Sequence, residues 1–340
     1  MSPHQTRVRS QSSLLVVAIV ATLGTGCATK HSVARTKPAE LNLKGVTKIA
    51  VLPFPGPDGA ELTSLITQGL FDSKRFEVVE REQLNKIMRE QGMSIDTAFQ
   101  GGGVAVGKLL PATALVSGRV MKAEYKESTG RSNETCTREV DIGNKKTKTE
   151  KYACVSYTRQ GGVQYLADVK VLDTTTGQIL ATRSLPASIK DSKSAIDQEP
   201  DRIDDHALMT ACRTDVASRF VKMVAPHTVM EQVVLATDGD LPELAAGNEY
   251  FTRNDNQKAV EYFTKAVARA DASSGMSPKT KGKAHYSLGL GQAVTGDYPN
   301  ALAQLDQAYG LDPNTDYLDF ATRVKQWKVE ADKLAQQSEK

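Results

Sequence analysis

The sequence predicts a mixed α/β domain followed by an all-α helical domain. A strand–helix–strand pattern with short connections occupies Lys48–Arg81. Apolar and polar residues alternate over Val163–Asp173, which is typical of a half-buried strand. Near Leu241 the composition changes to an alanine-rich helical pattern. A chain of 340 residues is long enough for two such domains.

The pattern over Lys48–Arg81 is that of a βαβ unit. Ile49–Leu52 is an apolar run that ends at Pro53, because proline has no N–H group to donate to a strand ladder. The apolar residues of Glu61–Phe71 recur at helical spacing, and Phe76–Val79 is a second short strand. Parallel strands joined by a helix cross over right-handed in nearly all cases.

These segments resemble the lipoproteins of the curli-secretion-channel (CsgG-like) family and its periplasmic relatives. The matching features are the motifs KIAVLPF and RFEVVERE, the predicted helix Leu84–Gln91, and GKLLPATALVSGRV at Gly107–Val120. The resemblance covers roughly residues 44–237 and implies a CsgG-like α/β domain of two or three layers. Its motifs are structural, so they indicate a fold more strongly than an activity.

Residues 1–26 have the features of an export signal. Arg7 and Arg9 precede the apolar stretch Leu14–Leu23, which is too short for a permanent transmembrane helix. The small residues before Cys27 resemble a bacterial lipoprotein cleavage site, although Leu23 lies one position earlier than usual. We predict acylation of Cys27, for example with palmitate, and an ordinary secretory signal is the alternative.

The residues after Cys27 suggest where the protein resides. Ala28 resembles the sorting signal of outer-membrane lipoproteins, which implies an outer-membrane lipoprotein that faces the periplasm. The polar segment Thr29–Leu41 contains Pro38, so residues 27–43 are predicted to be a tether.

A polar insertion separates two predicted strands of the first domain. Thr113–Glu124 is a strand whose Gly118 indicates a bulge or a close backbone approach, and Val163–Asp173 pairs in a hairpin with Gln178–Leu185. The insertion covers residues 125–162. Its Cys136 and Cys154 lie symmetrically about a turn, and export to an oxidising compartment favours a disulfide between them over two free thiols.

In the curli channel the hairpins that correspond to this insertion form the transmembrane pore. Neither Asn144–Lys151 nor Pro186–His206 has the apolar alternation that a lipid-facing strand needs. The sequence therefore predicts a periplasmic member that forms no pore. An oligomeric outer-membrane secretion channel for curli-like or other surface polymers is the alternative, and a homo-oligomer is left open.

The first domain is predicted to end with a helix and a strand. Ile203–Ala225 is a helix whose apolar face includes Cys212, a buried and inert thiol, and whose start is capped by the pair Asp204–Asp205. Val229–Leu235 is the last strand of the domain, which spans residues 44–237.

Residues 241–337 resemble tetratricopeptide repeats. Small and aromatic residues recur in two copies that begin at Gly247 and Gly289, and the segment Asp271–Lys281 accounts for the longer spacing. The resemblance implies a surface for other envelope proteins or peptides. Asn248, Tyr250 and Arg253 are candidate partner-binding residues.

No catalytic, cofactor or metal motif is present in the sequence. Gly102–Leu109 nearly matches a phosphate-binding loop but ends in leucine where a hydroxyl residue is required. The histidines are scattered and are predicted to be solvated. The formal net charge of +3 gives no reason to expect nucleic acid.

Taken with the resemblance, these observations predict a non-enzymatic, protein-binding scaffold or assembly factor of the cell envelope. An activator of a cell-wall synthase is a further alternative, by analogy of fold alone.

Overall fold

The computed structural model describes residues 29–79, 113–143, 146–174 and 176–338. The predicted signal at 1–26, the predicted acylation site Cys27, the predicted helix at Leu84–Gln91 and the glycine-rich segment Gly102–Leu109 lie outside these residues. The chain divides into two compact units. One contains Val33–Glu231 with Gln326–Lys340, and the other contains Gln232–Lys325 with the residues up to Ser32.

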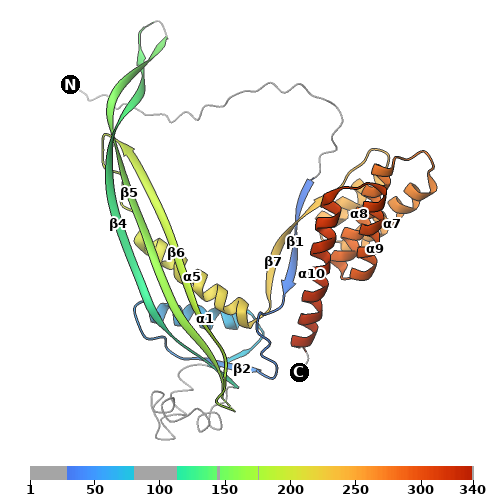
Figure 1. Cartoon of the computed structure of the whole chain (residues 1–340), viewed down its shortest axis with the longest axis horizontal. Helices are drawn as coiled ribbons and strands as arrows, with labels where there is room; N and C mark the ends of the chain where they lie inside the picture. The colour runs from blue at the N-terminus through green and yellow to red at the C-terminus, as the bar shows by residue number, and fades with distance from the viewer. Residues whose placement is uncertain (1–28, 80–112, 144–145, 175, 339–340) are drawn as a thin grey trace. The chain divides into compact units, whose positions relative to one another are not determined.

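The larger unit contains a five-stranded mixed sheet in the order β3-β2-β4-β5-β6. Its strands are β2 (Lys48–Val51), β3 (Glu77–Val79), β4 (Ala114–Asp141), β5 (Thr147–Asp173) and β6 (Ile179–Ile196). Strand β2 runs parallel to β3 and β4, whereas β4–β5 and β5–β6 are antiparallel. Helices α1 (Gly59–Asp72) and α5 (Asp205–Val224) lie alongside the long strands (Figure 1). The strand–helix–strand unit and the α/β class are confirmed.

The core lies between the sheet and the two helices. The predicted buried face of β5 is confirmed, since all five of its residues are at most 2% exposed: Val163, Tyr165, Ala167, Val169 and Val171. From α5, Cys212 and Phe220 are fully buried against it. The carboxylate of Asp204 caps α5 by accepting a hydrogen bond from the Ala207 N–H at 2.9 Å, as the sequence predicts.

Gly118 marks a close approach inside the core. A Cβ atom there would lie 2.3 Å from Cε1 of Phe54 and 2.3 Å from the carbonyl oxygen of Asp168. The Phe54 ring therefore occupies the space that the missing side chain leaves, as the glycine within a predicted strand indicates.

The three long strands extend well beyond their predicted ends. Strands β4 and β5 continue without interruption through the predicted insertion 125–162 as one hairpin, and β6 continues past Pro186 to Ile196. The insertion is therefore an extension of the sheet. Ladder hydrogen bonds satisfy the backbone whatever the side chains are, so polar strands exposed on both faces remain strands. Pro186 is tolerated because β6 is an edge strand among the described residues.

The predicted tether at 27–43 is wrong over much of its length. Residues Thr29–Lys37 form β1, which pairs with β7 (His227–Leu235). The guanidinium group of Arg35 donates hydrogen bonds to Glu231 at 2.9 Å and to Glu330 at 3.2 Å, and it lies 4.0 Å from the centre of the Trp327 ring. The partners that order this polar segment lie far along the chain, beyond the reach of a local pattern.

The C-terminal region is helical, as predicted. It comprises α6 (Pro242–Thr252), α7 (Asn256–Ala272), α8 (Pro278–Thr295), α9 (Tyr298–Leu311) and α10 (Thr315–Ser338). Helix α8 is buried on nearly all sides. The predicted loop Asp271–Lys281 is shorter than expected, because α7 and α8 both extend into it. The repeat character of these helices stays a prediction.

Candidate functional site

A bulge in β4 determines which of its side chains face the core and which face away from it. Successive residues of a strand point to opposite faces, so the even-numbered residues of β5 between Val163 and Val171 face away from the helices. The register between β4 and β5 shifts by one residue between Val120 and Lys122. Val120 is buried before the bulge, and Tyr125 packs against the core after it. Even-numbered residues of β4 beyond the bulge therefore face outward.

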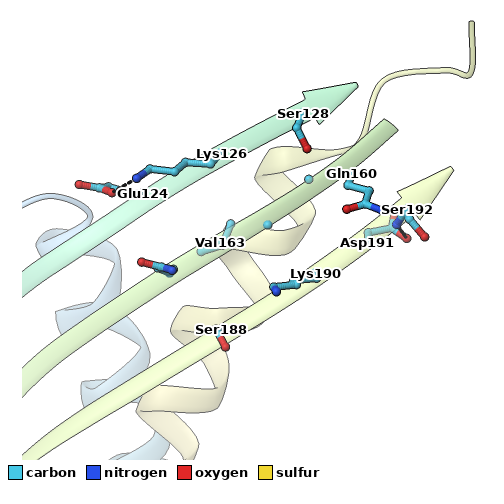
Figure 2. A pocket seen from close by; sticks show the side chains of 12 residues that line it. Glu124, Lys126, Ser128, Gln160, Val163, Ser188, Lys190, Asp191 and Ser192 are labelled. Carbon is cyan, nitrogen blue, oxygen red and sulfur yellow. Dashed lines mark hydrogen bonds and ion pairs between the residues drawn. The ribbon is translucent and has the colours of Figure 1, made fainter. Parts of the chain in front are cut away.

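These outward side chains surround a hollow of about 760 Å³ on the polar face of the long strands (Figure 2). The register aligns nine of its twelve lining residues in three rows across β4, β5 and β6, and the other three are Gly161, Val163 and Asp191. The rows are Glu124–Gln164–Ser188, Lys126–Gly162–Lys190 and Ser128–Gln160–Ser192. In the middle row a glycine on the central strand separates two lysines, so the floor carries no side chain at that point.

The charges around the hollow are unevenly paired. The Glu124 carboxylate lies 3.5 Å from the Lys122 ammonium and 3.7 Å from that of Lys126, whose side chain is 77% exposed. The Lys122 ammonium also donates to the Gln164 side-chain oxygen at 2.5 Å. Within the residues that the structure describes, the side chain of Lys190 forms no hydrogen bond or ion pair. The hollow thus presents one unpaired ammonium and one that is largely solvated.

The opposite face of the same strands is held by a charged cluster. Arg159 donates to Glu127 at 2.5 Å and to the carbonyl oxygen of Pro200 at 3.2 Å, and Tyr125 donates to Glu127 at 2.7 Å. The hydrogen bonds from Tyr125 and Arg159 lower the pKa of Glu127. Desolvation, followed by the bond to Glu127, raises the pKa of Tyr125 to about 12. These contacts fix the sheet directly behind the hollow.

A disulfide joins the strands farther along the hairpin. Cys136 and Cys154 are bonded, with their Cα atoms 5.8 Å apart. Cys136 lies opposite Tyr152 in the register, so the bridge connects diagonal neighbours on one face of the sheet. The ion pair between Arg138 and Glu150, at 3.0 Å, lies beyond it.

The three candidate partner-binding residues differ in their contacts within the fold. The Asn248 side chain donates to the carbonyl oxygen of Ala236 at 2.9 Å, so its amide nitrogen is used within the fold. Tyr250 stacks on Tyr262 with ring centres 5.3 Å apart. Arg253 is exposed and lies 4.0 Å from Glu249. Arg253 is therefore exposed and Tyr250 is half-buried, whereas the Asn248 amide supports the backbone.

One prediction about the histidines is wrong. His285 is only 7% exposed, with its ring nitrogens 2.7 Å from the side-chain oxygen of Gln304 and 3.3 Å from Asp271. No group of three or more potential metal-ligating side chains occurs within the described part of the chain. None of the described helices is both long enough and apolar enough to cross a membrane.

The hollow has only a weak signature in the sequence. The pair Gly161–Gly162 was the available signal, because glycines within a strand mark bulges or open space. The lysines could not be assigned to the hollow, since the bulge that turns Lys126 outward has no clear sequence signature.

The protein has a mixed sheet covered by helices, followed by further helices at the C-terminus. It is therefore a mixed α/β protein. Residues 39–198 match the model of the family described as "Curli production assembly/transport component CsgG". A CsgG-family domain is therefore supported over these residues, which are somewhat less than half of the chain. No curated protein matches the sequence.

Several solved structures are similar to part of the chain at low scores. Lipoprotein GNA1162 from Neisseria meningitidis has a TM-score of 0.28 and 12% identity, covering 51% of this chain and 95% of that one. The hypothetical protein CT253 from Chlamydia trachomatis has a TM-score of 0.27 and 12% identity, with coverages of 52% and 96%. The PelC dodecamer from Paraburkholderia phytofirmans has a TM-score of 0.26 and 13% identity, covering 57% of this chain and 99% of that one.

Proposed function

We propose that this protein is a bacterial envelope lipoprotein that acts as a protein-binding scaffold or assembly factor without forming a pore. In this proposal Cys27 carries the lipid anchor, and the folded units face the periplasm from the outer membrane. The export signal, the small residues before Cys27 and the CsgG-family domain support it. No cofactor and no catalytic step are part of the proposal.

The observation that carries the proposal is the polar character of the distal hairpin. Between Lys126 and Asp141 of β4, every residue except Cys136 is exposed. Neither face of this stretch has the apolar alternation of a strand that contacts lipid. A long, polar, disulfide-bonded sheet is suited to contact other proteins in water.

A second contact surface is proposed on the helical region. Tyr250 is half-buried on α6, where it stacks on Tyr262 of α7, and Arg253 is exposed at the C-terminal end of α6. Stacked tyrosines are favourable contacts for a partner, because they offer a large rigid area with a polar tip. Other envelope proteins or peptides are the proposed partners.

Site-specific photo-crosslinking in cells tests this function. A photoreactive residue would replace Tyr250 or Ser132, and Phe71 on α1, which is 65% exposed, would be the matched control. We expect discrete crosslinked bands from Tyr250, Ser132 or both, and none from Phe71. Equal crosslinking from all three positions, or none from any, would contradict a specific scaffold role.

An oligomeric secretion channel is the second candidate, and one observation favours it. Beyond Val120, β4 pairs only with β5 among the described residues, and the outer edge of β6 is unpaired in the same part of the structure. Unpaired edges can pair between copies. Light scattering and negative-stain imaging of the detergent-extracted chain separate the candidates. A ring of many subunits supports the channel, and a monomer or dimer supports the scaffold.

A further inference from the structure

We propose that the hollow on β4, β5 and β6 is a binding site for an anionic glycan that carries carboxylate or phosphate groups. This inference goes beyond the scaffold function, and it rests on the geometry of the hollow alone. It requires neither the lipid anchor nor a protein partner.

The shape of the hollow suits a short stretch of polymer. Its volume of about 760 Å³ is within the range of small-ligand sites. Gly162 leaves the centre of the floor open, and a Cβ atom there would lie 3.2 Å from Cγ of Lys190. Figure 2 shows the lining side chains along three adjacent strands, so a chain-like ligand can lie across them.

The charge of the hollow favours an anion at its centre. Neighbouring strands are about 4.8 Å apart, so Lys126 and Lys190 stand roughly 10 Å apart with Gly162 between them. An oxyanion above Gly162 can reach both ammonium groups, and such charge-assisted hydrogen bonds are stronger than neutral ones. Two carboxylates also line the hollow. Glu124 lies beside two lysines, so it does not cancel both charges of the middle row. Asp191 alternates with Lys190 and Ser192 along β6, so its side chain starts from the opposite face, and it accepts a hydrogen bond from the Ser192 N–H at 2.8 Å.

The rows on either side of the lysines favour a ligand rich in hydroxyl groups. Ser188 and Ser192 on β6, Ser128 on β4 and Gln160 on β5 offer hydroxyl and amide groups that both donate and accept hydrogen bonds. Sugar hydroxyl groups have the same dual capacity. The side chains of these four residues form no hydrogen bond with one another in the described part of the chain.

A peptide is a poorer occupant of this face. Peptides that bind sheets usually add a strand to an open edge through backbone hydrogen bonds. At the hollow, β5 is paired on both sides, with β4 and with β6. Only side chains are therefore available to a ligand at the centre of the floor.

Isothermal titration of the detergent-extracted full chain tests the site. The probes are oligogalacturonate, which carries carboxylates, a phosphorylated mannan oligosaccharide, neutral dextran oligosaccharide and polyglutamate. We expect at least one anionic oligosaccharide to bind at least tenfold more tightly than dextran and polyglutamate, and more weakly at high salt. The two anionic probes show whether carboxylate or phosphate is the preferred group.

Variants locate the binding. Lys126→Gln combined with Lys190→Gln should weaken binding of the preferred probe at least tenfold, and Gly162→Val should also weaken it by filling the floor. Lys146→Gln with Lys148→Gln, on exposed positions of the same hairpin, is the matched control and should leave binding unchanged. A circular dichroism spectrum checks that each variant folds. No binding of either anionic probe, equal binding of polyglutamate, or equal loss in the control would overturn the proposal.

Discussion

The two ends of the β4–β5 hairpin share the same strands but are stabilised differently. Near the helices, Val116, Val120 and Val169 are almost completely buried and belong to the core. Beyond Lys126, the residues of β4 are exposed on both faces, and the strands are joined by ladder hydrogen bonds, a disulfide and surface ion pairs. One backbone pattern thus serves a core element and an exposed arm.

The difference shows how a sheet can carry function away from its core. Buried apolar area contributes roughly 25 cal/mol per Å², so the proximal end contributes most to the stability of the unit. The distal arm buries little, and its side chains are free to be polar and to contact ligands or partners.

The largest expected effect comes from truncating the core. Phe220 on α5 is fully buried beside β5. We expect Phe220→Ala to reduce the free energy of unfolding by about 3–5 kcal/mol, because it removes apolar contacts and leaves a cavity. Val140→Ala, at a position 37% exposed on the arm, should change it by less than about 0.5 kcal/mol. Denaturant unfolding measures both, and similar losses would contradict the comparison.

The disulfide should act on the arm. The bridge closes a loop with a sequence separation of 18, and loops of this size correspond to about 3 kcal/mol in the chain-entropy model. In Cys136→Ser with Cys154→Ser, we expect faster hydrogen exchange in residues 126–160 and little change in the exchange of α5. Arg138→Gln, which breaks only an exposed ion pair, is the control. Loss of protection in α5 equal to that in the arm would show that the two ends unfold together.

Two adjacent glycines of β5 lie on opposite faces of the sheet. A Cβ atom at Gly161 would lie 2.5 Å from the hydroxyl oxygen of Tyr125 and 3.0 Å from Cγ2 of Ile203. We expect Gly161→Ala to destabilise the unit by about 1–3 kcal/mol through overpacking. A Cβ atom at Gly162 would lie 3.2 Å from Cγ of the flexible Lys190 stem and 3.4 Å from the carbonyl oxygen of Ile189, so Gly162→Ala should cost clearly less. Thermal unfolding of both variants measures the two losses of stability. Equal losses would contradict the assignment of Gly161 and Gly162 to opposite faces.

The smallest expected effect is a pH dependence from Glu127. Hydrogen bonds from Tyr125 and Arg159 lower its pKa below the ordinary value of 4.5, so the unfolded state binds a proton at higher pH than the folded state does. The stabilisation is therefore present above about pH 4.5 and is lost as the pH falls through the folded-state pKa. Glu127→Gln should reduce the pH dependence of the melting temperature between pH 3 and 6, roughly the range over which a glutamate titrates. Glu139→Gln is the exposed control, and an equal reduction there would remove Glu127 as the cause.

Local patterns were sufficient for the core and for some of its details. The alternation of β5, the cap at Asp204, the buried Cys212 and the close approach at Gly118 all follow from neighbours in the sequence or from one residue's conformational needs. The pairing of Cys136 with Cys154 in the structure matches the pairing predicted from their symmetrical spacing. These features depend on short-range regularity, which a sequence displays directly.

Burial imposes a visible period on apolar residues, so the α/β class, the buried face of the sheet and the helical C-terminal region can be predicted from the sequence. Other features depend on contacts between residues far apart in the chain. The tertiary structure ordered β1 through Arg35 and its partners, extended the polar strands by backbone pairing, and turned Lys126 outward through the bulge after Val120. Backbone pairing and long-range ion pairs leave no period in the sequence. For that reason the hollow became visible only when the strands were aligned.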